Sequence, residues 1–272
     1  MSIHKSISLL IIAAGFASCQ KMERPPLVII PDDVAKLNGP LQRNLWFEGS
    51  GIDSIYYEKG VATNVAYDNG VQGKAYKGAT NSMMVFTAGS KIGSMTSFTV
   101  AFWMNTQKHT GGAQSIFMLG RSTDFWGNMF ALVEGNDNAA DNSMLLKFNF
   151  AGNWVEFNNN NGLNRLPDMY GKWKHIAFRY DEKTSVFSLF VDGEKYPIPD
   201  AVANRMKDNK PLGALAFKDP SKFIIGAFQQ HAGVSGNPDG WMLRYTGLLD
   251  QFKVYTVAVT DADIKTLFTT KR

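Results

Sequence analysis

The chain has 272 residues, enough for one large domain or two small ones. Hydrophobic residues make up 44% and charged residues 19%, a balance that supports a packed core and excludes bulk disorder. Lys and Arg number 28 against 24 Asp and Glu, and this net charge of +4 is spread along the chain, so no nucleic-acid partner is expected. The single Cys excludes an internal disulfide, and together with 4 His it excludes a cysteine-based zinc site.

The N-terminus has the pattern of an export signal. Lys5 precedes an apolar run over residues 7–17, and small residues then lead to Cys19. The run is shorter than the about 20 apolar residues that span a bilayer. The string Phe16-Ala-Ser-Cys19 resembles the lipobox of bacterial lipoproteins, with Phe in place of the usual aliphatic residue. The resemblance implies cleavage before Cys19, lipid on Cys19, and anchoring to a bacterial membrane, with the outer membrane or cell surface as the expected location.

These features divide the chain into three parts. Residues 1–18 are the predicted signal peptide, and residues 19–40 are a predicted lipid-anchored tether whose prolines disfavour both helix and central strand. Residues 41–272 are expected to form one domain, because no internal repeat or linker interrupts them.

Short β-type runs separated by Gly, Asn and Asp fill the predicted domain. Residues 97–104 alternate strictly, with Phe98, Val100, Phe102 and Met104 on one face and Ser97, Thr99, Ala101 and Trp103 on the other. Residues 173–180 alternate as well, and Asp192-Gly193 predicts a tight hairpin. Near the end, Thr260 is a candidate N-cap of a short helix. Many short strands without alternating helices predict an all-β, antiparallel two-sheet sandwich with a short C-terminal helix.

A series of strings then suggests a particular kind of sandwich. It includes Leu45-Trp-Phe-Glu-Gly49, Gly73-Lys-Ala-Tyr-Lys-Gly78, Ser97-Phe-Thr-Val-Ala-Phe-Trp103, Trp173-Lys-His-Ile-Ala177, Phe190-Val-Asp-Gly193 and the stretch from Tyr245 to Tyr255. In this order they resemble the concanavalin A-like lectin/glucanase superfamily, in particular its laminin-G-like branch in secreted bacterial proteins. The resemblance spans about residues 45–268. It implies a jelly roll of two curved antiparallel sheets, a fold that hosts many functions.

Catalytic residues are not expected. Glycosidases of this fold carry paired acids on one strand, in a pattern such as Glu-x-Asp-x-x-Glu, and no such motif occurs. The nearest acidic clusters, residues 134–137 and 181–182, lie in stretches that read as turns. No Gly-x-Ser-x-Gly elbow occurs, and His175 within a strand is expected to be structural. The spacing of acidic residues along the sequence does not exclude two acids that meet in a groove from different strands. A divergent glycosidase or lyase therefore stays open as an alternative.

The resemblance also implies a calcium site. Relatives often hold one structural calcium ion where the first and last strands meet, and the matching residues here are Glu48 and Asp250, with Gly78 as a carbonyl donor. Two carboxylates alone underfill a calcium shell. The alternative is therefore that these are ordinary polar residues at strand ends.

Three tryptophans lie among turn residues and are candidates for a ligand surface: Trp126, Trp154 and Trp241. Exposed aromatic faces stack on sugar rings while amides and acids bind hydroxyls, so these three residues, with Tyr170, are the predicted ligand-binding residues. Trp46 lies in a strand motif and is expected in the core instead. The alternative for the loop tryptophans is that they only cover the edge of the sandwich.

The sequence therefore favours a non-catalytic binding module at a bacterial surface, with a carbohydrate as the expected partner. A structural or adhesive domain that contacts another protein is the alternative. Aromatic side chains gathered on one face would favour sugar, whereas a flat apolar patch elsewhere would favour protein.

Overall fold

The computed structural model describes residues 37–271. The predicted signal peptide, Cys19 and most of the predicted tether therefore lie outside the described residues. Within residues 37–271, no helix is long and apolar enough to cross a membrane.

Eight strands form the first sheet, and all of its pairs are antiparallel. Its spatial order is β13 (Glu194–Lys195), β12 (Val186–Val191), β11 (Lys174–Asp181), β6 (Phe98–Asn105), β18 (Leu248–Tyr255), β4 (Lys74–Lys77) and β3 (Ala66–Asn69), with β1 (Leu41–Leu45) also paired to β18. Asp192 and Gly193 join β12 to β13 with positive φ at both residues, so the predicted tight hairpin is confirmed.

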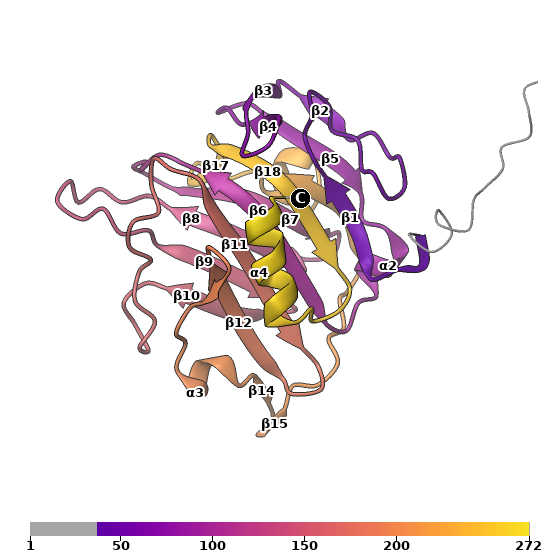
Figure 1. The fold of residues 1–272 in the computed structure, drawn as a ribbon, viewed down its shortest axis with the longest axis vertical. Helices are drawn as coiled ribbons and strands as arrows, with labels where there is room; N and C mark the ends of the chain where they lie inside the picture. The colour runs from indigo at the N-terminus through magenta and orange to yellow at the C-terminus, as the bar shows by residue number, and fades with distance from the viewer. Residues whose placement is uncertain (1–36, 272) are drawn as a thin grey trace, which may run out of the picture.

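The second sheet also has eight strands (Figure 1). Its spatial order is β10 (Asn153–Phe157), β9 (Leu146–Phe150), β8 (Met129–Glu134), β7 (Ala113–Arg121), β16 (Pro220–Ile225), β5 (Met83–Thr87) and β2 (Val61–Thr63), with β17 (Met242–Arg244) paired in parallel to β7. A separate small hairpin joins β14 (Met206–Lys207) to β15 (Lys210–Pro211). The helical segments are α2 (Ser90–Gly93), α3 (Asp200–Ala203), the 3-10 turn η1 (Gln229–Ala232) and α4 (Asp261–Thr270).

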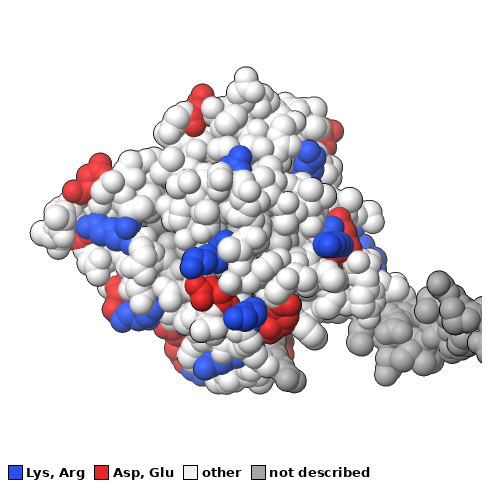
Figure 2. Space-filling model, turned by 90° about the horizontal axis from the view of Figure 1, so that it is seen from above, with Lys and Arg blue, Asp and Glu red and all other residues white. Residues whose placement is uncertain are grey.

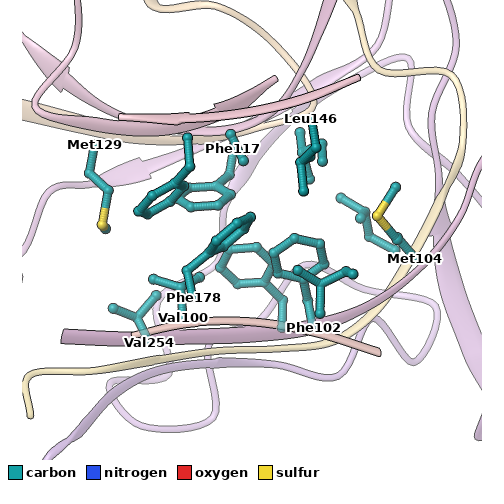
Figure 3. Packing of buried hydrophobic residues seen from close by; sticks show 14 of the residues in the cluster. Val100, Phe102, Met104, Phe117, Met129, Leu146, Phe178 and Val254 are labelled. Atoms are coloured by element: carbon teal, nitrogen blue, oxygen red, sulfur yellow. The ribbon is translucent and has the colours of Figure 1, made fainter. Parts of the chain in front are cut away.

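The main core lies between the two sheets. Phe102, Phe178 and Val254 of the first sheet meet Phe117 and Leu146 of the second in this layer (Figure 3). Because side chains alternate along a strand, each inward residue leaves its neighbour on the outer face of the sheet. The faces predicted for residues 97–104 are confirmed, and the all-β two-sheet sandwich with a C-terminal helix is the observed fold.

Helix α4 covers the outer face of the first sheet (Figure 1). Thr260 caps it, since the Thr260 hydroxyl accepts from the Asp263 backbone N–H while the Asp263 carboxylate accepts from the Thr260 N–H. Ile264 packs on small residues of β6 and β11, and the Phe268 ring stacks 5.4 Å from Trp103. The part of this face around β6 and β11 is therefore occupied by the chain itself.

Trp46 does not lie in the core as expected. Strand β1 ends at Leu45, which belongs to the core between the sheets, as does Phe47 two residues later. Alternation therefore places Trp46, the residue between them, on the opposite side. Phe47 turns inward to pack 5.7 Å from Tyr76, and Trp46 is left 48% exposed.

Charged side chains are mixed in sign on the surface. Figure 2 shows Lys and Arg beside Asp and Glu on the face that it draws. Ion pairs between exposed partners, such as Lys77 with Asp68, contribute to this pattern. Such a face offers no extended field of one sign to a charged polymer.

Candidate ligand-binding site

The outer face of the second sheet carries a row of side chains from three neighbouring strands. Phe130 of β8 pairs with Asn149 of β9, and Asn149 pairs with Trp154 of β10. The residues that flank them along each strand belong to the core between the sheets, so alternation places this row on the opposite face. Trp154 therefore stands in a strand, whereas the sequence suggested a turn.

Six aromatic residues gather around this row, and we call them the aromatic cluster: Phe125, Trp126, Phe130, Trp154, Phe228 and Trp241. The Trp126 ring stacks on Phe130 with centroids 5.5 Å apart and meets the Trp154 ring edge-on at 5.0 Å. Trp241 lies 5.9 Å from Trp126. The structure thus brings together the three tryptophans singled out from the sequence.

The members of the aromatic cluster differ in exposure. Phe130 and Phe228 are buried, and Trp126 and Trp154 are partly buried against them. Phe125 is 41% exposed and Trp241 is 38% exposed. Part of each indole therefore covers the sheet, as one of the two sequence interpretations proposed, while the outer rings present aromatic surface to solvent.

A buried glutamine holds the loop that carries Trp126. The side-chain amide of Gln229 donates to the carbonyl oxygens of Asp124 (2.7 Å) and Phe125 (3.0 Å), and its oxygen accepts from the Arg121 backbone N–H (2.8 Å). Asp124 also accepts from the Trp126 backbone N–H at 3.0 Å, which closes a tight turn. Gln229 is fully buried, so these bonds fix the loop in a water-excluded position.

A second contact fixes Trp241. Its carbonyl oxygen accepts from the Ala113 backbone N–H at 2.9 Å. A Cβ on Gly112 would meet that same oxygen at 1.9 Å, so only glycine allows the two backbones to approach this closely. The Trp241 backbone is thus tied to the start of β7.

A groove of about 690 Å³ opens beside Trp154, and we call it the amide groove. Its polar lining includes Glu156, Asn158, Asn160 and Arg205. One aromatic ring beside several amides and an acid is the set of groups that binds sugar hydroxyls and the C–H faces of sugar rings. The amide groove and the aromatic cluster share Trp154, so together they form one continuous candidate site.

Two acids from different strands do meet on this face. Lys147 of β9 lies 2.8 Å from a Glu134 oxygen and 3.6 Å from a Glu156 oxygen. Glu134 is the last residue of β8, whereas the sequence suggested a turn. The lysine ammonium stands between the two carboxylates and pairs with both. This arrangement differs from a glycosidase pair, in which the two acids face the scissile bond from either side.

Tyr170 lies apart from the aromatic cluster. It forms an isolated bridge with Thr106 and belongs to the core between the sheets, with only 8% of its surface exposed. Burial raises the pKa of its hydroxyl above the ordinary value of 10.0. The structure therefore does not bring Tyr170 together with Trp126, Trp154 and Trp241.

Glu48 and Asp250 lie on either side of one turn, residues 70–73. Glu48 accepts from the Lys74 backbone N–H at 2.8 Å, and Asp250 accepts from the N–H groups of Val71 (2.9 Å) and Gln72 (3.2 Å). Gly78 follows the other end of β4, where its N–H donates to a carbonyl oxygen. Two of the three residues named for a metal thus lie together, and the third lies apart from them.

The two carboxylates make a pair that a cation would stabilise. Burial raises the pKa of Asp250 to about 6 against the lowering effect of its hydrogen bonds, and the negative charge of Glu48 adds to the rise. A pocket of about 350 Å³ beside them is lined by Glu48, Gln72 and Gln251, whose amide oxygens are hard ligands of the kind calcium prefers. Among residues 37–271, no cluster of three or more His, Cys, Asp or Glu side chains is present. A calcium shell here would therefore depend on amide and carbonyl oxygens. The Gln251 amide oxygen accepts from the buried Lys253 ammonium at 3.2 Å, so an ion would compete with this ammonium for it.

The fold and this face define a lectin-type β-sandwich. A family described as the concanavalin A-like lectin/glucanases superfamily matches residues 78–265, more than half of the chain, and the protein belongs to this family. No curated protein matches the chain.

Several solved structures share the fold. Domain 4 of an extracellular arabinanase from Geobacillus stearothermophilus, in complex with arabinotriose, is 17% identical with a TM-score of 0.53, covering 84% of this chain and 97% of that chain. The binding domain of Paraclostridial mosquitocidal protein 1 is 16% identical with a TM-score of 0.53, covering 87% of this chain and 53% of that chain. The binding domain of botulinum neurotoxin DC, in complex with rat synaptotagmin II, is 12% identical with a TM-score of 0.51, covering 86% of this chain and 52% of that chain. At these identities the likeness concerns the fold.

Proposed function

We propose that the protein is a non-catalytic carbohydrate-binding module and that the glycan lies across the aromatic cluster and into the amide groove. The observation that carries the proposal is the convergence of Trp126, Trp154 and Trp241 from three separate segments onto one face beside a groove lined by amides. Part of the outer face of the first sheet is covered by α4, whereas the aromatic cluster and the amide groove lie on the second sheet.

Two further observations support binding rather than bond cleavage. Lys147 pairs with both Glu134 and Glu156, so neither acid stands free to face a glycosidic oxygen. The arabinanase domain that shares this fold was solved with a bound arabinotriose, which shows that the fold can hold a short glycan. The neurotoxin domain, solved with synaptotagmin, makes a protein ligand the alternative.

A glycan array tests the proposal. The full chain is compared with a variant in which Trp126, Trp154 and Trp241 are all replaced by Ala. We expect the wild type to bind a defined set of glycans and the variant to lose that binding, because Trp side chains dominate the energy of recognition surfaces. Trp173→Ala is a matched control, since Trp173 lies outside the aromatic cluster. Unchanged binding by the triple variant would contradict the proposal.

We also propose that lipid on Cys19 holds this module at a bacterial membrane, with the outer membrane or cell surface as its location. The proposal rests on the sequence before residue 37: the short apolar run, the small residues and the single Cys. Several acyl chains anchor a protein far more firmly than one, because each buried methylene contributes about 0.8 kcal/mol.

A structural calcium ion between Glu48 and Asp250 is a further proposal. The ion would relieve the repulsion between the two carboxylates and fix the turn at residues 70–73 against β18. Its role would be to stabilise the fold, because this turn belongs to the first sheet and the candidate ligand site to the second.

A further inference from the structure

Arg205 is the cation of the amide groove. Its Nη1 donates to the Val202 carbonyl oxygen at 3.1 Å and its Nη2 to the Trp154 carbonyl oxygen at 3.4 Å. Its Nε is buried and has no hydrogen-bond partner among the described residues. Both bonds go to neutral groups, and no carboxylate in residues 37–271 forms an ion pair with this guanidinium.

The acid in the same groove shares the Lys147 ammonium with Glu134, which lies closer to it. Glu156 lies 3.6 Å from the Lys147 ammonium and accepts from the Asn158 side-chain amide at 3.2 Å. Of the charged side chains that line the amide groove, Arg205 is thus the one without an ion-pair partner among residues 37–271. Burial lowers the pKa of Arg205 below its ordinary value, which shows that its surroundings disfavour an uncompensated cation.

We propose that the sugar held in the amide groove carries a carboxylate, and that this carboxylate pairs with Arg205. The inference rests on the proposed carbohydrate-binding function and adds the class of ligand. A guanidinium presents a planar fork of donors that matches a carboxylate with two parallel hydrogen bonds. Trp154 lies beside Arg205 in the groove, so one sugar residue can stack on the indole while its acid group reaches the guanidinium.

Uronic acids and sialic acids share this chemistry, and matched ligand pairs distinguish them. Trigalacturonic acid is compared with its methyl ester, and 3′-sialyllactose is compared with lactose, by calorimetry with the wild-type chain. We expect at least one acidic member to bind about tenfold or more tightly than its neutral counterpart, the effect of a charge-assisted hydrogen-bonded pair. The ester comparison changes only the ligand, so it does not depend on any variant folding.

The variant Arg205→Gln tests which cation is responsible. We expect it to remove the preference for the acidic ligand while binding of the neutral counterpart is kept. Arg179→Gln, on the outer face of the first sheet, is the matched control and is expected to keep the preference. Circular dichroism and a thermal melt establish that both variants are folded.

Each other outcome has a separate meaning. Equal affinity of the wild type for acidic and neutral members would overturn the inference and leave the proposed function standing. A preference that survives in Arg205→Gln would overturn the assignment to Arg205. Absence of binding to any glycan, on the array and in calorimetry, would contradict the proposed function and this inference together.

Discussion

Replacing His175 with Phe tests whether α4 seals the outer face of the first sheet. The imidazole of His175 lies 5.3 Å from the Trp103 ring and 6.1 Å from the Phe268 ring of α4. Its Nδ1 is buried and has no hydrogen-bond partner among the described residues. Burial, with a contribution from the positive charge of Lys253, lowers the pKa of His175 from 6.5 to about 4.

The size of the effect follows from the two pKa values of His175. The unfolded chain takes up the proton near pH 6.5 and the folded chain only near pH 4, so acid favours unfolding. The stabilisation is fully present above the unfolded pKa and is lost as the pH falls towards the folded one. At about pH 4.5 the loss from this residue amounts to about 2.5 kcal/mol.

Denaturant unfolding of both proteins at about pH 7.5 and about pH 4.5 measures this difference. His175→Phe keeps an aromatic ring against Trp103 and Phe268 but removes the titration. Other titrating groups are common to both proteins and cancel in the comparison. We expect the wild type to lose about 2.5 kcal/mol more than the variant on acidification. Equal losses would refute the reasoning, because they would mean that His175 is solvated and that α4 leaves this face open.

Three further predictions concern the ligand face, the calcium site and the anchor. Gln229→Ala removes three buried hydrogen bonds to the loop of Trp126 and is expected to cost about 2–4 kcal/mol of stability and to weaken glycan binding. Denaturant unfolding measures the first effect and the glycan array the second. Unchanged stability and binding would contradict the role given to Gln229 in holding this loop. With calcium at about 100 times its Kd, the free energy of unfolding is expected to rise by about 2.7 kcal/mol, seen as a higher Tm than in chelator. Glu48→Gln should reduce that rise, and an identical Tm with and without chelator argues against the ion. Cys19→Ala is expected to move the protein from the membrane fraction to the soluble fraction, and an unchanged membrane fraction would refute the lipid anchor.

The layer structure could be predicted from the sequence because its signal is local. Phe98, Val100, Phe102 and Met104 recur at every second position, and that period of two predicts that they share one face. Thr260 could be predicted as a cap for the same reason, since a cap and its partner lie three residues apart.

The positions of residues at strand ends were not all predictable in this way. Leu45 and Phe47 both face the core, so Trp46 between them is exposed although its motif suggested the core. Glu134 belongs to β8 although Gly and Asn follow it directly. In both cases the residue lies at the end of a strand, where the motif or the turn-forming composition nearby gave no reliable boundary.

The supports of the candidate site depend on contacts between distant segments. Gln229 holds a loop about a hundred residues earlier in the chain, and Arg205 reaches the backbone of Trp154 from another segment. Neither residue stands in a motif, so no local pattern distinguishes it from any other surface Gln or Arg. The tryptophans themselves could be singled out because an indole among Gly and Asn is conspicuous, although their convergence required the fold.

The indole N–H resonances of the tryptophans test the central claim most directly, because the same spectrum contains its own controls. A 15N-labelled sample is titrated with a glycan that the array identifies. We expect the signals of Trp126, Trp154 and Trp241 to shift together while that of Trp103, sealed under α4, stays in place. Shifts confined to Trp46, or no shift among the three clustered indoles at saturating glycan, would contradict binding at this face of the second sheet.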